Sequence, residues 1–407
     1  MDYVNILCTS DLHGYVEGIR GKAGFYETLQ ELKKEYPHSL LIDNGDYLSG
    51  SRLATYLNIM EEGRPLVDMA NRIGYDVMIP GNHEFDLGID RLMGVRDAFR
   101  GSYLCCNLMD RKGEYIFKPW CLLKNGGLKI GIIGLVTGNL SQLTEVENLE
   151  GVHVIRPVLA LKDLLPQIRG KADLVILCYH GGIEREMQSG KWTQYDTGED
   201  EAYRLIETFP EIDGLICGHQ HREEAGCKNN TLYVQPGYGG TSIGRLFFSK
   251  EGGRILRRKA ELIHAADHRQ TAGAAERPLL QWDEGYQRWK LGIPDLSHLP
   301  SFIERHFSCD GFLFEVRETT REGFYNSFSA PYHVSLYQFS DAEWKEILEL
   351  YEKTDPDGKL LMREREEPGK QWHRILSNIQ TLPYDRIIQR FFINFPDTYE
   401  MELFRKG

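Results

Sequence analysis

Residues 75–86, YDVMIPGNHEFD, contain the pattern that decides the fold. Tyr75–Ile79 is a short apolar run that predicts a buried strand, and Pro80-Gly81 ends it. An open α/β sheet commonly forms its site where such strands end, at their carboxyl edge. The polar side chains that follow this strand at once are those of Asn82, His83, Glu84 and Asp86.

Four other apolar runs in the first two thirds of the chain end in the same way. Amphipathic segments such as Lys22–Tyr36 and Val158–Ile168 alternate with these runs and predict helices. We therefore predict an α/β fold in which five strands bring Asp, Asn and His side chains to one edge. The four further strand ends are Asp11-Leu12-His13, Asp43-Asn44-Gly45-Asp46, His180-Gly181-Gly182 and Gly218-His219-Gln220-His221.

The type and spacing of these side chains predict a metal centre. In Asp11-x-His13 and His219-x-His221, an extended backbone would point both members of a pair to one side, where both could reach one centre. Oxygen and imidazole ligands without a thiolate favour Mn²⁺, Zn²⁺, Fe or Co over a structural, cysteine-rich zinc site. A carboxylate that bridges two ions would hold them ~3.5–4 Å apart.

The ordered motifs D-x-H, G-D, G-N-H-E-x-D, H-G-G and G-H-x-H resemble those of the calcineurin-like metallophosphoesterases. The chain looks most like the 5′-nucleotidase and 2′,3′-cyclic-nucleotide phosphodiesterase branch, with further support from Glu199–Tyr203 and the turn Gln235–Gly240. The resemblance covers residues 1 to about 250 and implies a four-layer αββα sandwich. It also implies roles for nine residues: Asp11, His13 and His221 as ligands of one metal, Asn82, His180 and His219 as ligands of a second, Asp46 as the bridge, His83 as the contact to the scissile phosphate, and Asp86 as the acid that orients His83.

The resemblance implies a phosphoester hydrolase that uses two divalent metal ions and acts on nucleotides by metal-hydroxide attack on phosphorus. The alternatives are a 2′,3′-cyclic-nucleotide phosphodiesterase, another small-molecule phosphoesterase, a nuclease, or a non-catalytic scaffold of the same fold. A scaffold would predict missing ligands, and none is missing. Asp43 and Glu84 are further acids near the site, which either support the ligands or cap local structure. Asn107 follows a predicted strand and is a weaker candidate to line the site.

Composition narrows the possible partners. The 407 residues are 41% hydrophobic and 27% charged, which is typical of a globular protein with two or three domains. The net charge of -12 disfavours nucleic acid and anionic membranes as partners, so we expect a small-molecule phosphoester. No apolar stretch reaches the ~18 residues of a membrane span. The chain shows no signal-peptide pattern and its eight cysteines form no C-x-x-C pair, so we expect a cytoplasmic protein with reduced thiols. The oligomeric state stays open.

The chain changes character after the first two thirds. We predict a catalytic domain over residues 1–263, a linker over 264–290, and a smaller α+β domain over 291–407 that is a reduced substrate-binding domain. Ser340–Glu343 has the form of a capping box and predicts the start of a helix. The apolar residues of Ile387–Phe392 also fit a helical face, and Arg386 and Arg390 would share one face that is either solvated or meets an anion. The aromatic residues of Phe324–Tyr332 suit either stacking on a base or packing in a core, which leaves the substrate-binding residues unknown.

Overall fold

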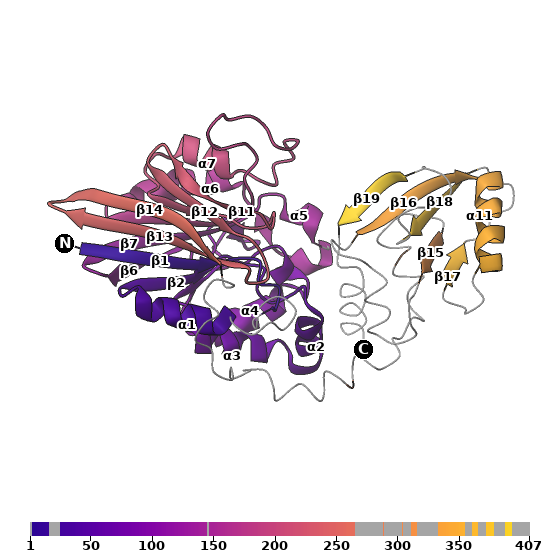
Figure 1. Cartoon of the computed structure of the whole chain (residues 1–407), viewed down its shortest axis with the longest axis horizontal. Coiled ribbons are helices and arrows are strands. Elements are labelled where there is room, and N and C mark those ends of the chain that lie inside the picture. The colour runs from indigo at the N-terminus through magenta and orange to yellow at the C-terminus, as the bar shows by residue number, and fades with distance from the viewer. Residues whose placement is uncertain are drawn as a thin grey trace. The chain divides into compact units, whose positions relative to one another are not determined.

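The protein is described here by a computed structural model (Figure 1). Two compact units divide the chain, Met1–Leu280 and Gln281–Gly407, and each is described by itself. The predicted linker over 264–290 lies outside the described residues except for its residues 264 and 288. The assignment of domain roles therefore stays a prediction. The structure describes residues 2–15, 25–144 and 146–264 of the first unit and residues 288, 303, 311–315, 333–354, 360–364, 372–377 and 387–392 beyond them.

The first unit contains two six-stranded sheets. In the first sheet, of order β14-β13-β1-β2-β3-β4, the strands β1 to β4 run parallel, and β13 and β14 add an antiparallel hairpin at the edge. The sequence pattern did not predict β14. The strand bounds are β1 Asp2–Thr9, β2 Ser39–Asp43, β3 Val77–Met78, β4 Ser102–Tyr103, β13 Ser242–Glu251 and β14 Arg254–His264.

The second sheet has the order β11-β12-β10-β9-β7-β6. Its four central strands are parallel, and β6 and β11 pair antiparallel at the two edges. A short two-stranded sheet, β5 Leu108–Met109 with β8 His153–Val154, lies outside both. The bounds of the second sheet are β6 Trp120–Asn125, β7 Leu128–Val136, β9 Leu174–His180, β10 Gly214–Ile216, β11 Glu223–Lys228 and β12 Thr231–Pro236.

Strand β9 shows how the second sheet is buried on both faces. Ile176 and Cys178 lie in a core cluster shared with Val4 and Ile6 of β1, which places that cluster between the two sheets. Val175, Leu177 and Tyr179, which alternate with these residues, lie in a second cluster with residues of helix α6, Pro157–Arg169, and helix α7, Ala202–Thr208. A continuous apolar run is the pattern expected of a parallel strand covered on both sides.

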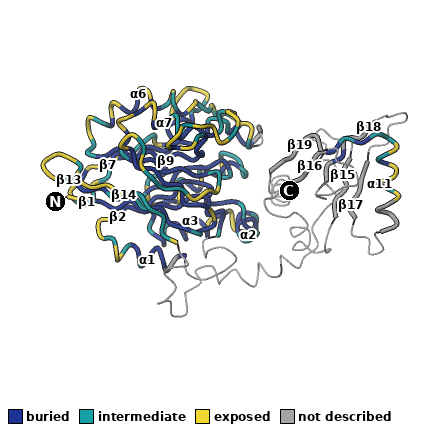
Figure 2. The backbone as a smooth tube through the Cα atoms, turned by 45° about the horizontal axis from the view of Figure 1, so that its top comes forward, coloured by how far each residue is buried: buried dark blue, intermediate teal, exposed yellow. Residues whose placement is uncertain are grey.

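Helices cover the outer faces of the two sheets, so the predicted four-layer αββα sandwich is confirmed. Figure 1 shows α6 and α7 on one side of the paired sheets and α1 and α3 on the other. Figure 2 shows the strands between them as the buried centre of the unit. The helices are α1 Phe25–Glu35, α2 Arg52–Glu61, α3 Arg64–Ile73, α4 Ile89–Ala98, α5 Leu140–Leu143, α6 Pro157–Arg169 and α7 Ala202–Thr208, with 3₁₀ turns at His83–Phe85 and Val146–Leu149.

The second unit is an α+β fold, as predicted. Its sheet has the order β17-β15-β18-β16-β19, and helix α11, Asp341–Thr354, begins at the predicted capping box: the Ser340 amide donates to Glu343 Oε2 at 2.8 Å. Phe324–Tyr332 lies outside the described residues. The strands are β15 Gly311–Glu315, β16 His333–Ser340, β17 Leu360–Glu364, β18 Trp372–Ser377 and β19 Ile387–Phe392.

The prediction of a helix at Ile387–Phe392 is wrong. These residues form β19, which pairs antiparallel with β16. Their isoleucine and phenylalanine residues favour a strand as much as their spacing favours a helix, and pairing with the sheet decides between the two. Arg390 is therefore on a strand, and Arg386 lies outside the described residues.

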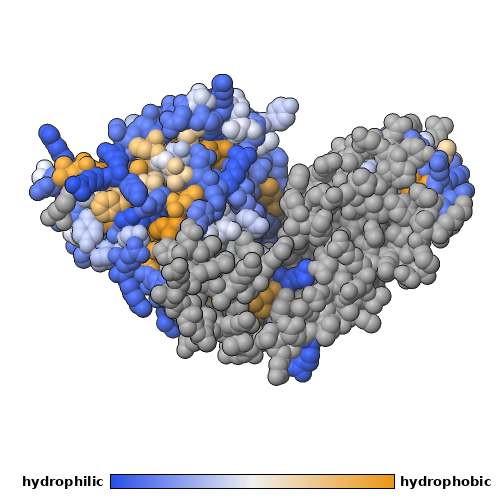
Figure 3. Space-filling model, in the orientation of Figure 1, coloured by the Kyte–Doolittle hydropathy of each residue, from blue (hydrophilic) through white to orange (hydrophobic). Residues whose placement is uncertain are grey.

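The surface of the first unit carries both hydrophobic and hydrophilic residues, and Figure 3 shows the hydrophobic ones lying among the hydrophilic ones. Within the described part of the chain, no helix has the length and apolar character of a membrane span. Six of the described cysteines are buried and Cys227 is exposed, all of them as free thiols. Cys309 lies outside the described residues.

Candidate metal centre

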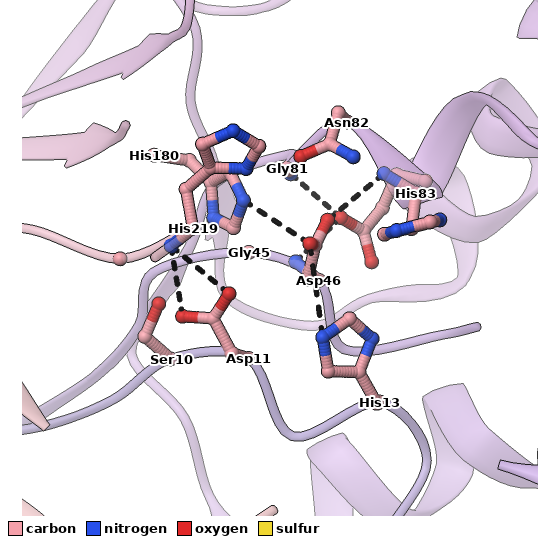
Figure 4. Close-up of polar contacts among 12 residues, drawn as sticks. Ser10, Asp11, His13, Gly45, Asp46, Gly81, Asn82, His83, His180 and His219 are labelled. Carbon is pink, nitrogen blue, oxygen red and sulfur yellow. Dashed lines mark hydrogen bonds and ion pairs between the residues drawn. The ribbon is translucent and has the colours of Figure 1, made fainter. Parts of the chain in front are cut away.

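The candidate site lies where strands of both sheets end. The loops after β1, β2 and β3 carry Asp11 with His13, Asp46, and Asn82 with His83. Strand β9 ends at His180, and the loop after β10 carries His219 and His221. Because the two sheets pack face to face, these five strand ends meet at one place (Figure 4). The structure thus brings together all the side chains that the sequence motifs single out.

The histidines and carboxylates form two groups, each with ligand atoms within 4.8 Å of one another. The first group is Asp11, His13 and His221, and the second is Asp46, His180 and His219. His219 and His221 therefore belong to different groups. The expectation that this pair reaches one centre is wrong, whereas the division between two metals that the resemblance implies agrees with the grouping.

The physical reason lies in the backbone. Asp11, His13, Asp46, His219 and His221 all have φ between 50° and 71°, the left-handed region, so they are not extended. Non-glycine residues rarely adopt this conformation, which costs of order 1–3 kcal/mol each and clusters at functional sites. The strands end before these residues, and tight turns rather than strand alternation aim the side chains.

Asp46 belongs to the second group and also approaches the first. Its Oδ2 is 3.2 Å from His180 Nε2 and 3.9 Å from His13 Nε2, while its Oδ1 accepts the His83 amide at 2.9 Å. Burial opposes ionisation, yet the nearby His180, His83 and His13 lower the pKa of Asp46 well below its usual range. An ionised carboxylate in this position can share its oxygens between two cations.

Of three histidines near Asp46, His13 and His221 have lowered pKa values, whereas His180 has a raised one. Burial lowers the pKa of His13 to about 4, and burial also lowers the pKa of His221, so both rings are neutral near pH 7. Burial would lower the pKa of His180 as well, but Asp46 raises it to about 10. A cation bound beside Asp46 would replace that proton, because a histidine ligand must be neutral.

Asn82 supplies an independent test of whether the site fits a metal. Its side chain is 4% exposed, and its Oδ1 has no hydrogen-bond partner. A buried amide oxygen without a partner costs about 1–3 kcal/mol. His180 Nε2 is also buried without a hydrogen bond, although it forms an ion pair with Asp46 Oδ2 at 3.2 Å. Figure 4 shows Asn82 beside Asp46 and His180, so the second group has oxygen and nitrogen atoms left over for a cation.

His83 and Asp86 form a pair beside the two groups. His83 Nδ1 lies 2.9 Å from Asp86 Oδ2, and Ser49 Oγ donates to the same oxygen at 2.8 Å. Burial would lower the pKa of His83, but the charges of Asp86 and Asp46 raise it to about 10. A charged, oriented imidazole that is still partly exposed can meet an anion.

Glu84 holds the loops of the site together, a role that the sequence analysis left open. Its carboxylate accepts four backbone amides: those of Asp46 and Gly81 on Oε2, and those of Tyr47 and Leu48 on Oε1, at 2.6–3.0 Å. In the sequence, the only indication of this role was the position of Glu84 within the G-N-H-E-x-D motif.

Asp43 and Asn107 connect neighbouring segments by hydrogen bonds, and among the described residues neither belongs to a ligand group. Asp43 accepts from the hydroxyl of Thr9 and from the amide of Gly45. Asn107 donates to the carbonyls of Val136 and Ile155.

Comparison with known proteins adds to this geometry. A sequence model of the calcineurin-like phosphoesterases matches residues 4–223, more than half of the chain. A 2′,3′-cyclic-nucleotide 2′-phosphodiesterase/3′-nucleotidase of Salmonella typhimurium is 28% identical over 244 residues, which cover 54% of this chain and 36% of that protein. A 5′-nucleotidase of Vibrio parahaemolyticus is 29% identical over 292 residues, 64% of this chain and 50% of that protein. The chain thus spans half or less of the length of these two relatives.

A solved structure extends the likeness in fold to the whole chain. A Staphylococcus aureus protein designated a candidate 5′-nucleotidase superposes with a TM-score of 0.72, covering 100% of this chain and 97% of that one. The identity is 20%, so this likeness concerns the fold alone.

Proposed function

The chain belongs to the calcineurin-like phosphoesterase family, and we propose that it hydrolyses phosphoester bonds of nucleotides at the two ligand groups. One observation carries this proposal: Asp46, a member of the second set of carboxylate and imidazole ligands, also lies 3.9 Å from His13 of the first set, beside the His83–Asp86 pair. A phosphoester is an anion, and the chain carries a net charge of -12, so local cations are needed to hold it.

Each group would hold one divalent ion. Asp11, His13 and His221 would bind the first, and Asn82, His180 and His219 the second, with Asp46 shared between them. Two bound cations would offset the charge of the phosphate and lower the pKa of water. The oxygen and nitrogen ligands accept Mn²⁺, Zn²⁺, Fe or Co.

The chain's own residues account for the rest of the chemistry. His83 is held by Asp86 on Nδ1, which leaves Nε2 as the atom that meets a phosphate oxygen or the leaving oxygen. Asp86 raises the pKa of His83, which favours the protonated ring that can donate to the developing negative charge. Glu84 fixes the loops that carry Asp46 and His83, so the distances between them are set before substrate arrives.

The second candidate function is hydrolysis of 2′,3′-cyclic nucleotides. The aligned stretch of the Salmonella typhimurium relative, whose name includes that activity, supports it. A cyclic diester and a monoester present the same phosphorus to the same ligands, so the metal groups do not discriminate between them. The choice depends on how the rest of the nucleotide is bound.

A substrate panel with metal analysis of the same preparation tests both proposals. Initial rates on AMP and on 2′,3′-cyclic AMP would be compared after loading with Mn²⁺, with the chelated protein as control. We expect metal-dependent turnover of at least one nucleotide. A preparation that binds two ions and yet lacks turnover on a broad phosphoester panel would favour the non-catalytic scaffold instead.

A further inference from the structure

Three of the four histidines in the two groups, His13, His180 and His219, differ in what holds the ring nitrogen that faces away from the group. His13 Nδ1 and His180 Nδ1 each lie 2.7 Å from a backbone carbonyl, of Ser49 and Asn44. A ring nitrogen that donates to an oxygen carries the proton, and the other nitrogen keeps its lone pair for a cation. His13 and His180 would therefore bind through Nε2.

His219 is held in the opposite sense. Its Nε2 lies 2.6 Å from Glu199 Oε1, so the proton belongs on Nε2 and Nδ1 is left for the cation. Its partner is a carboxylate rather than a carbonyl, and a negative charge on that side makes the ring a better donor of its lone pair. Glu199 comes from the loop between β9 and α7, twenty residues before His219.

The loop around Glu199 has two further sets of contacts, neither of which involves the Glu199 carboxylate. The backbone carbonyl of Glu199 accepts from Thr137 Oγ1 at 2.7 Å and from Tyr179 Oη at 3.0 Å. The next residue, Asp200, accepts from Gln220 Nε2 at 2.8 Å and from the Gly182 amide. The loop that carries the carboxylate is thus tied to the residue that follows His219.

We propose that Glu199 is a positioning residue of the metal centre, which fixes the His219 ring with Nδ1 toward the second ion. This inference rests on the proposed metal centre and goes beyond it, since the Glu199–Tyr203 segment had no role there. The competing explanation is that Glu199 only stabilises its loop. Asp200 separates the two, because it makes comparable loop contacts and touches none of the four histidines within the described residues.

The experiment compares Glu199→Ala, Glu199→Gln and the matched control Asp200→Asn in the full chain. Affinity for the two ions is measured by chelator competition with Zn²⁺, and thermal stability is measured without metal. We expect Glu199→Ala to weaken the binding of one ion by about 10–100-fold, the range for such outer partners. Glu199→Gln should fall in between, because its amide oxygen still accepts from Nε2 but carries no charge. Asp200→Asn should lower stability and leave both affinities within about threefold of wild type, less than the effect of an outer partner.

A second readout concerns the bound atom itself. In Zn²⁺-loaded protein labelled with ¹⁵N-histidine, long-range ¹H–¹⁵N spectra tell which ring nitrogen binds the metal. We expect Nδ1 for His219 and Nε2 for His13 and His180. Wild-type affinity in Glu199→Ala, equal losses in Asp200→Asn, or Nε2 binding by His219 would each overturn the inference. If the wild-type protein binds no ion, the proposed function fails before this question arises.

Discussion

The two ligand groups contain the same kinds of side chain but differ in their access to solvent. In the second group the side chains of Asp46 and His180 are 2% and 0% exposed, and that of His219 is 12% exposed. In the first group Asp11 is fully buried, but the His221 side chain is 43% exposed and packs against the half-exposed ring of Tyr238. Similar ligands at one edge of a fold can therefore form two groups with unequal exposure to solvent, one enclosed and one partly open.

The largest expected effect comes from Asp46, because it lies close to histidines of both ligand groups. Asp46→Asn removes the charge that lies between His180 and His13 and leaves those histidines without a shared partner. We expect lower metal content and a loss of turnover beyond the roughly 10²–10⁴-fold that one positioned acid supplies. Metal analysis and initial rates on the same sample measure both.

Asp43→Asn is the matched control, three residues earlier. Burial raises the pKa of Asp43 well above its usual range, whereas that of Asp46 is lowered, so removing the charge costs less at Asp43 than at Asp46. We expect both ions and most of the activity to survive there. Near-normal turnover of Asp46→Asn with two ions bound would contradict the shared role.

His83 tests whether catalysis can be separated from metal binding. Its ring is 5.4 Å from that of His13, centroid to centroid, but it belongs to neither group. His83→Ala should keep both ions and lose about 10²–10⁴-fold in rate, the range for a positioned general acid. Asp86→Ala should lose less, since the ring stays and only its orientation relaxes. Loss of metal in His83→Ala would mean that this residue belongs to the ligand set.

These tests concern residues that the sequence predicted, and the limits of that prediction are physical. Periodicity and turn residues indicated the strands, and polar residues after each strand indicated the site. His219 and His221 belong to different ligand groups because the backbone turns through left-handed conformations at these non-glycine residues. Local residue propensities do not predict such turns. The contact of Glu199 with His219 joins separate loops, and β19 depends on pairing with β16. Such long-range contacts leave no periodic trace in the sequence.

Removal of metal compares the two groups directly. With a chelator in excess, we expect the ion of the first group to leave sooner, by about tenfold or more, which corresponds to about 1.4 kcal/mol in the barrier. The reason is that His221 can swing into solvent, whereas release from the second group requires buried side chains to move. Anomalous diffraction from crystals with half of the manganese removed should show the stronger peak beside His180. Equal peaks, or the stronger one beside His221, would reverse the comparison.

The smallest expected effect concerns Tyr238, which stacks on His221 with ring centroids 4.9 Å apart and planes 14° from parallel. An aromatic pair contributes about 0.5–1.5 kcal/mol, so Tyr238→Ala should weaken the first ion by about 2- to 10-fold. Tyr238→Phe keeps the ring and should match the wild type. Chelator competition measures both, and only the weaker of the two binding steps should change. If Tyr238→Ala weakens both ions equally, the stack does not act on the first group alone. The weaker binding of the first ion would then have to follow from the exposure of His221.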